Sequence, residues 1–235
     1  MNDFLVNFER EAFLALNGSS FAYLDRVMWL VSGKVIWLPV VCLILYYLIQ
    51  KKSWREWLPV LLSIALVVLL CDQFASSVCK PIFMRLRPTH NPLIMNQVDT
   101  VNGYLGGKYG FISSHAANAF GFAMLMTLIF KNRIFTWSIM FWAIIDSYSR
   151  IYLGVHFITD VLAGIPVGLL FGYLVYKLYF YVVTKKFTTL FRPSSYGTKE
   201  IFPIIYGLLA TFFVILVFNG PIISFFREIV MNRPL

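Results

Sequence analysis

The chain has 235 residues, of which 59% are hydrophobic and only 13% are charged. With a mean hydropathy of +0.74, this composition excludes an ordinary soluble domain and predicts an all-α, polytopic bundle of transmembrane helices. The formal net charge is +9, but the cations are divided among short loops, which is typical of an inserted bundle. We therefore expect a phospholipid bilayer around the protein and no nucleic-acid partner.

The first 26 residues carry acids early and hold no continuous apolar stretch. Their apolar side chains are instead spaced as on an amphipathic helix, and they are Phe4, Leu5, Phe8, Phe13, Leu14 and Leu16. Residues 1–26 are therefore predicted to include a short helix that lies along the membrane interface.

Six apolar stretches follow, and several reach the roughly 20 residues that are needed to cross a bilayer. They run about Val27–Ile49, Trp57–Val78, Ser114–Phe130, Ile134–Ser149, Thr159–Val183 and Ile201–Phe218. Lys34 is an unexpected charge within the first of them. We expect one transmembrane domain over residues 27–218, followed by an interfacial tail over residues 219–235.

The fifth stretch carries a glycine at every fourth position, at Gly164, Gly168 and Gly172. These glycines leave a smooth helix face against which another helix can pack closely. Packing within the bundle is the favoured interpretation and a dimer seam is the alternative, so the oligomeric state stays open.

Alternation of the six spans divides the Lys and Arg residues equally, with ten of the 20 on each side. Three cations on the side of the termini belong to the polar cluster described below. Once these three are set aside, the side with loops 50–56, 131–133 and 184–200 carries more Lys and Arg than the other. This excess of cations in short loops places the three loops in the cytoplasm. The cluster is then expected at the periplasmic or extracellular face.

Three segments on that opposite side concentrate polar and charged side chains. They are Lys80-Pro-Ile-Phe-Met-Arg-Leu-Arg87-Pro88, then Ser113-Ser114-His115, and finally Ser149-Arg150 followed by His156 and Asp160. Ionisable groups beside membrane spans are costly unless they have a function. Three cations, two hydroxyls and two imidazoles suit the binding of a phosphate whose ester bond is to be broken.

The predicted phosphate-binding residues act through charge and through backbone donors. Lys80, Arg87 and Arg150 neutralise the phosphate, and Arg adds forked hydrogen bonds that Lys cannot make. Ser113 and Ser114 precede an apolar helix as N-caps, and a helix start presents free N–H groups to an anion.

The predicted catalytic residues are two histidines and an aspartate. His156 and Asp160 are four residues apart, so on one helix they share a face, and the carboxylate can hold one imidazole nitrogen while the other attacks phosphorus. The leaving alkoxide then needs a proton, and His115 is the only plausible imidazole donor.

The patterns Lys-x6-Arg-Pro, Ser-x-His and Ser-Arg-x5-His-x3-Asp resemble, in order and separation, the three motifs of type 2 phosphatidic acid phosphatases. The resemblance spans roughly Asp72–Gly172. It implies a phosphohistidine at His156, His115 as acid and then as base for water, and no metal or other cofactor. The family usually has Pro-Ser-Gly-His where this chain has Ile112-Ser113-Ser114-His115. Backbone donors survive the Gly-to-Ser change unless the position needs a positive φ.

Other polar residues near the three motifs are expected to play smaller parts. Arg85 and His90 fall between or beyond the matched positions, so we interpret them as phosphate-neighbouring or exposed loop residues. Asp146 lies four residues before Arg150 and is expected to orient its guanidinium.

These observations predict an integral lipid phosphatase of the inner (plasma) membrane with its site on the periplasmic or extracellular face. The resemblance implies undecaprenyl diphosphate, lipid A phosphate and phosphatidylglycerol phosphate as candidate substrates. We expect acyl chains to enter along the apolar faces of the second and fifth spans. A lipid-to-lipid phosphotransferase shares the first step and stays open. A non-catalytic lipid transporter or scaffold is disfavoured, because a carrier needs no nucleophile.

Overall fold

The structure, a computed structural model, describes residues 3–19, 21–50, 53–186 and 198–231. These residues form helices, with one isolated antiparallel bridge and no strand longer than that. The prediction of an all-α membrane protein is confirmed. Three helices are long and apolar enough to cross a membrane, Trp54–Phe83, Ile158–Lys185 and Ile201–Phe225, and one bent helix pair raises this number to four.

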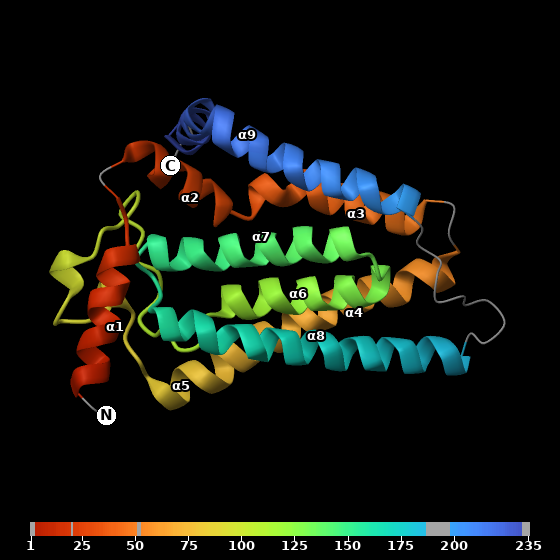
Figure 1. Cartoon of the computed structure of the whole chain (residues 1–235), viewed down its shortest axis with the longest axis horizontal. Coiled ribbons are helices and arrows are strands. Elements are labelled where there is room, and N and C mark those ends of the chain that lie inside the picture. Colours follow the sequence, from red (N-terminus) through yellow and green to blue (C-terminus); the bar gives the residue numbers. More distant parts are fainter. Residues whose placement is uncertain (1–2, 20, 51–52, 187–197, 232–235) are drawn as a thin grey trace.

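In chain order the helices are α1 (Asp3–Leu16), α2 (Ala22–Val31), α3 (Leu38–Ile49), α4 (Trp54–Gln73), α5 (Lys80–Phe83), α6 (Ser114–Phe130), α7 (Arg133–Tyr152), α8 (Ile158–Lys186) and α9 (Thr198–Met231). Helices α3, α4, α6, α7, α8 and α9 run roughly along one direction, as Figure 1 shows. Short helical turns η1 (Val35–Trp37), η2 (Phe74–Cys79), η3 (Pro88–His90) and η4 (Met95–Gln97) complete the described helices. The span predicted at Ser114–Phe130 coincides with α6.

The first apolar stretch is two helices rather than the single span predicted over residues 27–49. α2 begins earlier, at Ala22, and α3 follows it at a bend of 67°. The break lies at Ser32, Gly33 and Lys34. The N–H of Gly33 donates to the carbonyl of Leu30 at 2.9 Å, a tighter hydrogen bond than that of an α-helix. Gly33 and Lys34 in succession favour such a break, because glycine has a low helix propensity and the charged end of a lysine side chain is most stable in contact with water.

The glycine face of α8 packs against α6, which confirms the interpretation as packing within the bundle. A side chain at Gly164 would place its Cβ 2.7 Å from the carbonyl oxygen of Ser113. One at Gly172 would lie 2.5 Å from the carbonyl oxygen of Gly121, and one at Gly168 would collide with the backbone of Ala117. This close approach holds the beginnings of α6 and α8 together, where two of the predicted motifs lie.

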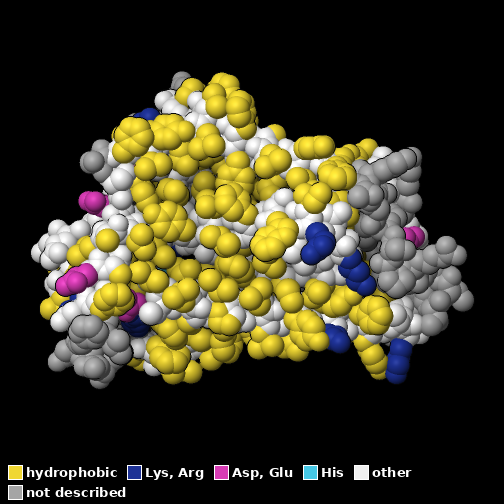
Figure 2. All heavy atoms as spheres, viewed as in Figure 1, with side chains coloured by type: hydrophobic (Ala, Val, Ile, Leu, Met, Phe, Trp, Pro, Cys, Tyr) yellow, Lys and Arg dark blue, Asp and Glu magenta, His cyan; other side chains and the backbone are white. Residues whose placement is uncertain are grey.

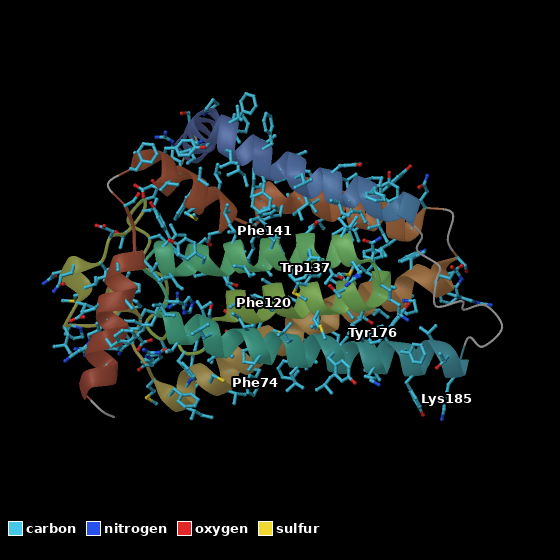
Figure 3. The ribbon with its side chains drawn as sticks, viewed as in Figure 1. Phe74, Phe120, Trp137, Phe141, Tyr176 and Lys185 are labelled. Atoms are coloured by element: carbon cyan, nitrogen blue, oxygen red, sulfur yellow. The ribbon has the colours of Figure 1, made fainter. Side chains whose placement is uncertain are left out.

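Aromatic contacts join neighbouring helices on two sides of the bundle. Phe74 packs edge-on against Phe171 of α8, with ring centroids 5.6 Å apart. Phe141 of α7 lies 6.1 Å from Phe212 of α9 on the other side of the bundle. Figure 3 shows Phe74 and Phe141 on these opposite sides. Figure 2 shows that apolar side chains cover most of the visible face, as expected for helices that contact lipid.

The predicted N-terminal helix is present as α1, and it crosses the end of the bundle at which α7 ends and α8 begins (Figure 1). Phe13 anchors it there, because its side chain is fully buried and its ring packs edge-on against Phe157 at 5.3 Å. α1 therefore covers the end of the bundle that carries the three polar segments.

Candidate active site

The long polar loop after α5 is folded back on itself and is held by backbone hydrogen bonds. Leu86 and Tyr109 form an antiparallel bridge. The N–H of Arg87 donates to the carbonyl of Lys108 at 3.1 Å, and the N–H of Gly110 donates to that of Arg85 at 2.8 Å. The pairing of these two short segments places the first motif beside the beginnings of α6 and α8.

Arg87 is held by backbone carbonyls on two sides. Its Nε donates to Tyr109 at 3.1 Å and its Nη1 donates to Val155 at 3.4 Å, while its Nη2 has no partner within the described residues. Gly106, at φ +69°, passes so close that a Cβ there would lie 2.6 Å from Nη1. Burial, followed by the charge of Arg150, lowers the pKa of Arg87. The guanidinium remains charged at neutral pH, because its unperturbed pKa exceeds 12.

Arg150, in the last turn of α7, is buried and bound by residues from two distant segments. Its Nη1 donates to Ser32 Oγ in the break after α2. Its Nη2 donates to Tyr104 Oη at 3.3 Å, and its guanidinium lies 5.5 Å from the centre of that ring. Its Nε is buried without a hydrogen-bond partner. An unpaired donor on a buried cation is what an anionic ligand would satisfy.

His156 and Asp160 meet, but not on one helix face as predicted, because α8 begins only at Ile158. Nδ1 of His156 lies 3.4 Å from Oδ2 of Asp160. The same oxygen accepts the N–H of Phe157 at 3.0 Å, so Asp160 reaches back over the start of α8. The backbone of Gly110 also hydrogen-bonds to the imidazole. Asp160 is fully buried and only 2% of His156 is exposed.

The three predicted phosphate-binding cations converge on His156. Burial lowers the pKa of His156 well below its ordinary value, and Arg87, Arg150 and Lys80 lower it further, in that order. Lys80 donates to Ser76 Oγ at 3.3 Å one helical turn earlier. The His156 imidazole is therefore neutral at pH 7, which is the protonation state that a nucleophile needs.

His115 lies in the first turn of α6 and close to Arg150. It interacts electrostatically with Arg150 and His156, and its imidazole hydrogen-bonds to the backbone of Ser32. Ser113 caps the helix, since its Oγ accepts the N–H of Ala116 at 3.4 Å.

The free backbone donors at the start of α6 are fewer than predicted. The N–H of Ser113 donates to the carbonyl of Asp160 at 2.9 Å, so it is not available to a ligand. The N–H groups of Ser114 and His115 have no partner within the described part of the chain. Two donors at this helix end can therefore face an anion.

Arg85 contacts Asp160 directly, although its sequence position suggested no specific role. Its Nη1 donates to Asp160 Oδ1 at 2.7 Å and to Thr159 Oγ1 at 2.6 Å, and its Nη2 lies 2.5 Å from Glu9 Oε2. Its guanidinium also stacks 4.6 Å from the centre of the Phe157 ring. Arg85 thus ties α1 to the carboxylate that contacts His156.

Several contacts differ from those expected. Within the described residues no hydrogen bond or ion pair joins Asp146 to Arg150, which is oriented by Ser32 and Tyr104 instead. Ser32, Tyr104 and Glu9 were missed because they lie in segments without a motif. Lys34, the unexpected charge two residues after Ser32, was the one sequence signal for that segment.

Known proteins resemble this chain in sequence and in fold. The family model described as the PAP2 superfamily matches residues 56–184. A lipid A 4'-phosphatase from Porphyromonas gingivalis is 45% identical over 179 residues, which cover 76% of each chain. A lipid A 4'-phosphatase from Bacteroides thetaiotaomicron is 35% identical over 227 residues, which cover 93% of this chain and 98% of that protein.

A solved structure supports the same fold. It is the crystal structure of the first transmembrane PAP2-type phosphatidylglycerolphosphate phosphatase from Bacillus subtilis, with a TM-score of 0.54 and 24% identity. The match covers 76% of this chain and 87% of that one. The chain belongs to the PAP2 superfamily, and the prediction of a membrane lipid phosphatase is confirmed.

Proposed function

We propose that this protein removes the 4'-phosphate from lipid A. The observation that carries the reaction is the convergence of Arg87, Arg150 and Lys80 on a buried His156 that also contacts Asp160. The choice of lipid A rests on the two relatives, which are both lipid A 4'-phosphatases and which match most of the chain.

The first chemical step transfers the phosphoryl group to His156. Asp160 accepts the Nδ1–H, so the other ring nitrogen carries the lone pair that attacks phosphorus. The bond from phosphorus to the sugar oxygen breaks, and His115 gives that oxygen a proton. The separation between Nδ1 of His156 and Oδ2 of Asp160 is 3.4 Å, which is long for a hydrogen bond.

The second step returns His156 to its free state. His115, now neutral, takes a proton from water, and the resulting oxygen nucleophile attacks the phosphorus of the phosphohistidine. The phosphorus–nitrogen bond breaks and inorganic phosphate leaves. Arg87, Arg150, Lys80 and the free N–H groups at the start of α6 stabilise the charge on the phosphoryl oxygens in both steps. No described cluster of His, Cys, Asp and Glu is suited to a metal ion, and these steps use none.

The helices are proposed to cross the inner membrane six times. α6 and α7 are not among the helices that are long and apolar enough to cross a membrane, but α6 packs along α4, α7 and α8 in the middle of the bundle (Figure 1). Its 17 residues span about 26 Å, close to the roughly 30 Å of a hydrocarbon core. α1 is proposed to lie at the interface above the site, and the site to face the periplasm.

A substrate panel tests the proposed activity. Purified protein in detergent is offered bis-phosphorylated lipid A, undecaprenyl diphosphate and phosphatidylglycerol phosphate at equal concentration, and phosphate release is measured with mass spectrometry of the product. We expect the highest kcat/KM with lipid A and a product that keeps the 1-phosphate. A preference for either other lipid, or loss of the 1-phosphate, contradicts the proposal. Phosphate recovered on an added acceptor lipid would identify a phosphotransferase.

A further inference from the structure

An apolar groove opens beside the break between α2 and α3. Its volume is about 490 Å³, within the range of about 300–1,000 Å³ that is usual for small-molecule pockets. One wall is formed by Val35, Ile36 and Pro39, which follow the break, and the other by Val214, Phe218 and Ile222 of α9.

Two bends in the facing helices create this groove. α2 and α3 are bent by 67°, and α9 departs from helical geometry at Phe218, with φ −111° and ψ 17°. Pro221 supports the second bend, because it has no N–H for a helical hydrogen bond. Two straight helices packed along their length would leave no such space.

Specific contacts hold the bends in place. The rings of Trp37 and Phe212 pack edge-on at 5.2 Å next to the groove. On the α2 side, Tyr23 Oη donates to the carbonyl of Leu216 at 2.8 Å, and Arg26 Nε donates to Asn219 Oδ1 at 2.8 Å. The groove is therefore a built feature of this packing.

The break connects the groove directly to the catalytic groups. The hydroxyl of Ser32 accepts from Arg150, and the backbone of Ser32 hydrogen-bonds to His115. Val35, only three residues later, already lines the groove, and three consecutive Cα–Cα steps of 3.8 Å span at most about 11 Å. Lys34, between them, is exposed and acts electrostatically on His115.

We propose that this groove binds an acyl chain of the lipid whose phosphate is cleaved. The inference rests on the proposed function and adds the path of the lipid chain. Phosphate and acyl chain belong to one amphiphile, and the break joins a polar contact with the site at Ser32 to an apolar groove that begins at Val35. α4 and α8, which the sequence favoured for acyl chains, also expose apolar side chains such as Leu69 and Leu170, but their other sides pack against each other and against α6.

A substrate chain must be distinguished from bulk lipid, because bilayer hydrocarbon is as apolar as the groove. The tethered phosphate supplies the difference: a chain joined to a bound phosphate enters the groove more often than a free one. Occupancy by substrate must therefore depend on the phosphate.

Photo-crosslinking measures this dependence. The probe is lipid A with a diazirine in one acyl chain of the 4'-phosphorylated sugar, and the matched control is the same lipid without its 4'-phosphate. We expect crosslinks at the groove walls with the probe and several-fold fewer with the control. Equal crosslinking by both lipids, or crosslinks concentrated on α4 and α8, would overturn the proposal. If the wild-type protein does not dephosphorylate the probe, the proposed function fails instead.

A pair of variants on α9 provides an independent kinetic measurement. Val214→Trp fills the groove, whereas Leu209→Trp adds the same bulk to an exposed position of the same helix outside it. We expect Val214→Trp to raise KM for lipid A by about tenfold or more, as for other misfits of an apolar pocket, with little change for para-nitrophenyl phosphate, which has no acyl chain. Equal KM for the two variants, or an equal loss with the soluble ester, would argue against the groove.

Discussion

At the scale of single residues, the two histidines of the site differ in their neighbours. His156 is enclosed by cations and a carboxylate, whereas His115 contacts the backbone of Ser32. We expect His115→Ala to lower turnover by about 10²–10⁴-fold, as for loss of a general acid, and His156→Ala to lower it further, because the nucleophile is lost.

The third histidine supplies the control for this experiment. His90 pairs with Thr89 in the long loop, 3.0 Å from its hydroxyl, so His90→Ala should leave turnover close to that of the wild type. Phosphate release from lipid A measures all three variants, with thermal unfolding as the check on folding. Substantial turnover by His156→Ala would remove this residue from the mechanism.

Arg85 supplies a second residue-scale prediction, because it bridges Glu9 and the fully buried Asp160. Arg85→Ala should lower both Tm and turnover, since removing one partner of a buried pair costs up to about 3–5 kcal/mol, here reduced because Arg85 is 26% exposed. Glu9→Gln should have a smaller effect in the same direction. Lys108→Ala removes an exposed cation of the same loop and is the control; an equal loss there would point to net charge instead.

The buried state of His156 also makes stability depend on pH. In the unfolded chain this residue takes up a proton as pH falls through about 6.5, whereas its folded pKa is well below that value. The unfolded state therefore binds more protons at low pH, and stability is lost as pH falls below about 6.5. Thermal unfolding in detergent at pH 7.5 and pH 5 should show a larger decrease in Tm for the wild type than for His156→Gln. Equal decreases would show that other groups dominate.

At the scale of elements, the contact between α6 and α8 positions two of the three motif segments. Gly168→Ala should destabilise the protein, because the new Cβ collides with the backbone of Ala117 and overpacking typically costs about 1–3 kcal/mol. Gly220→Ala in α9 is the matched control, since a Cβ there meets nothing within 4 Å and a helix gains about 0.5–1 kcal/mol on replacing Gly by Ala. Thermal unfolding compares the two; an unchanged Tm for Gly168→Ala would contradict the tight contact.

At the scale of the whole molecule, the orientation in the membrane can be tested by labelling with an impermeant thiol reagent in intact cells. Suitable single-cysteine positions are Gly107, in the site loop, and Arg133, the exposed first residue of α7. Cys42, Cys71 and Cys79 are first replaced by Ala. We expect labelling at Gly107→Cys and not at Arg133→Cys, since the basic loops are predicted to be cytoplasmic. The reverse pattern would place the site on the cytoplasmic side.

The sequence by itself determined the properties that depend on neighbouring residues. Apolar length identified a helical membrane protein, and the serine cap before an apolar run located α6. The order and spacing of the three polar motifs identified the cations, histidines and aspartate that the structure brings together. These features could be predicted because helix ends, hydrophobic length and residue chemistry are local.

Only the tertiary structure decided which distant segments complete the site. Ser32 binds Arg150 across 118 residues, and Glu9 binds Arg85 across 76. Neither pair has a spacing that a local pattern could reveal, because each forms only after helices from different parts of the chain have packed. The bend at Ser32 likewise depends on what it contacts: Arg150 and His115 satisfy its polar groups, so the first apolar stretch breaks beside the candidate site instead of continuing as one straight helix.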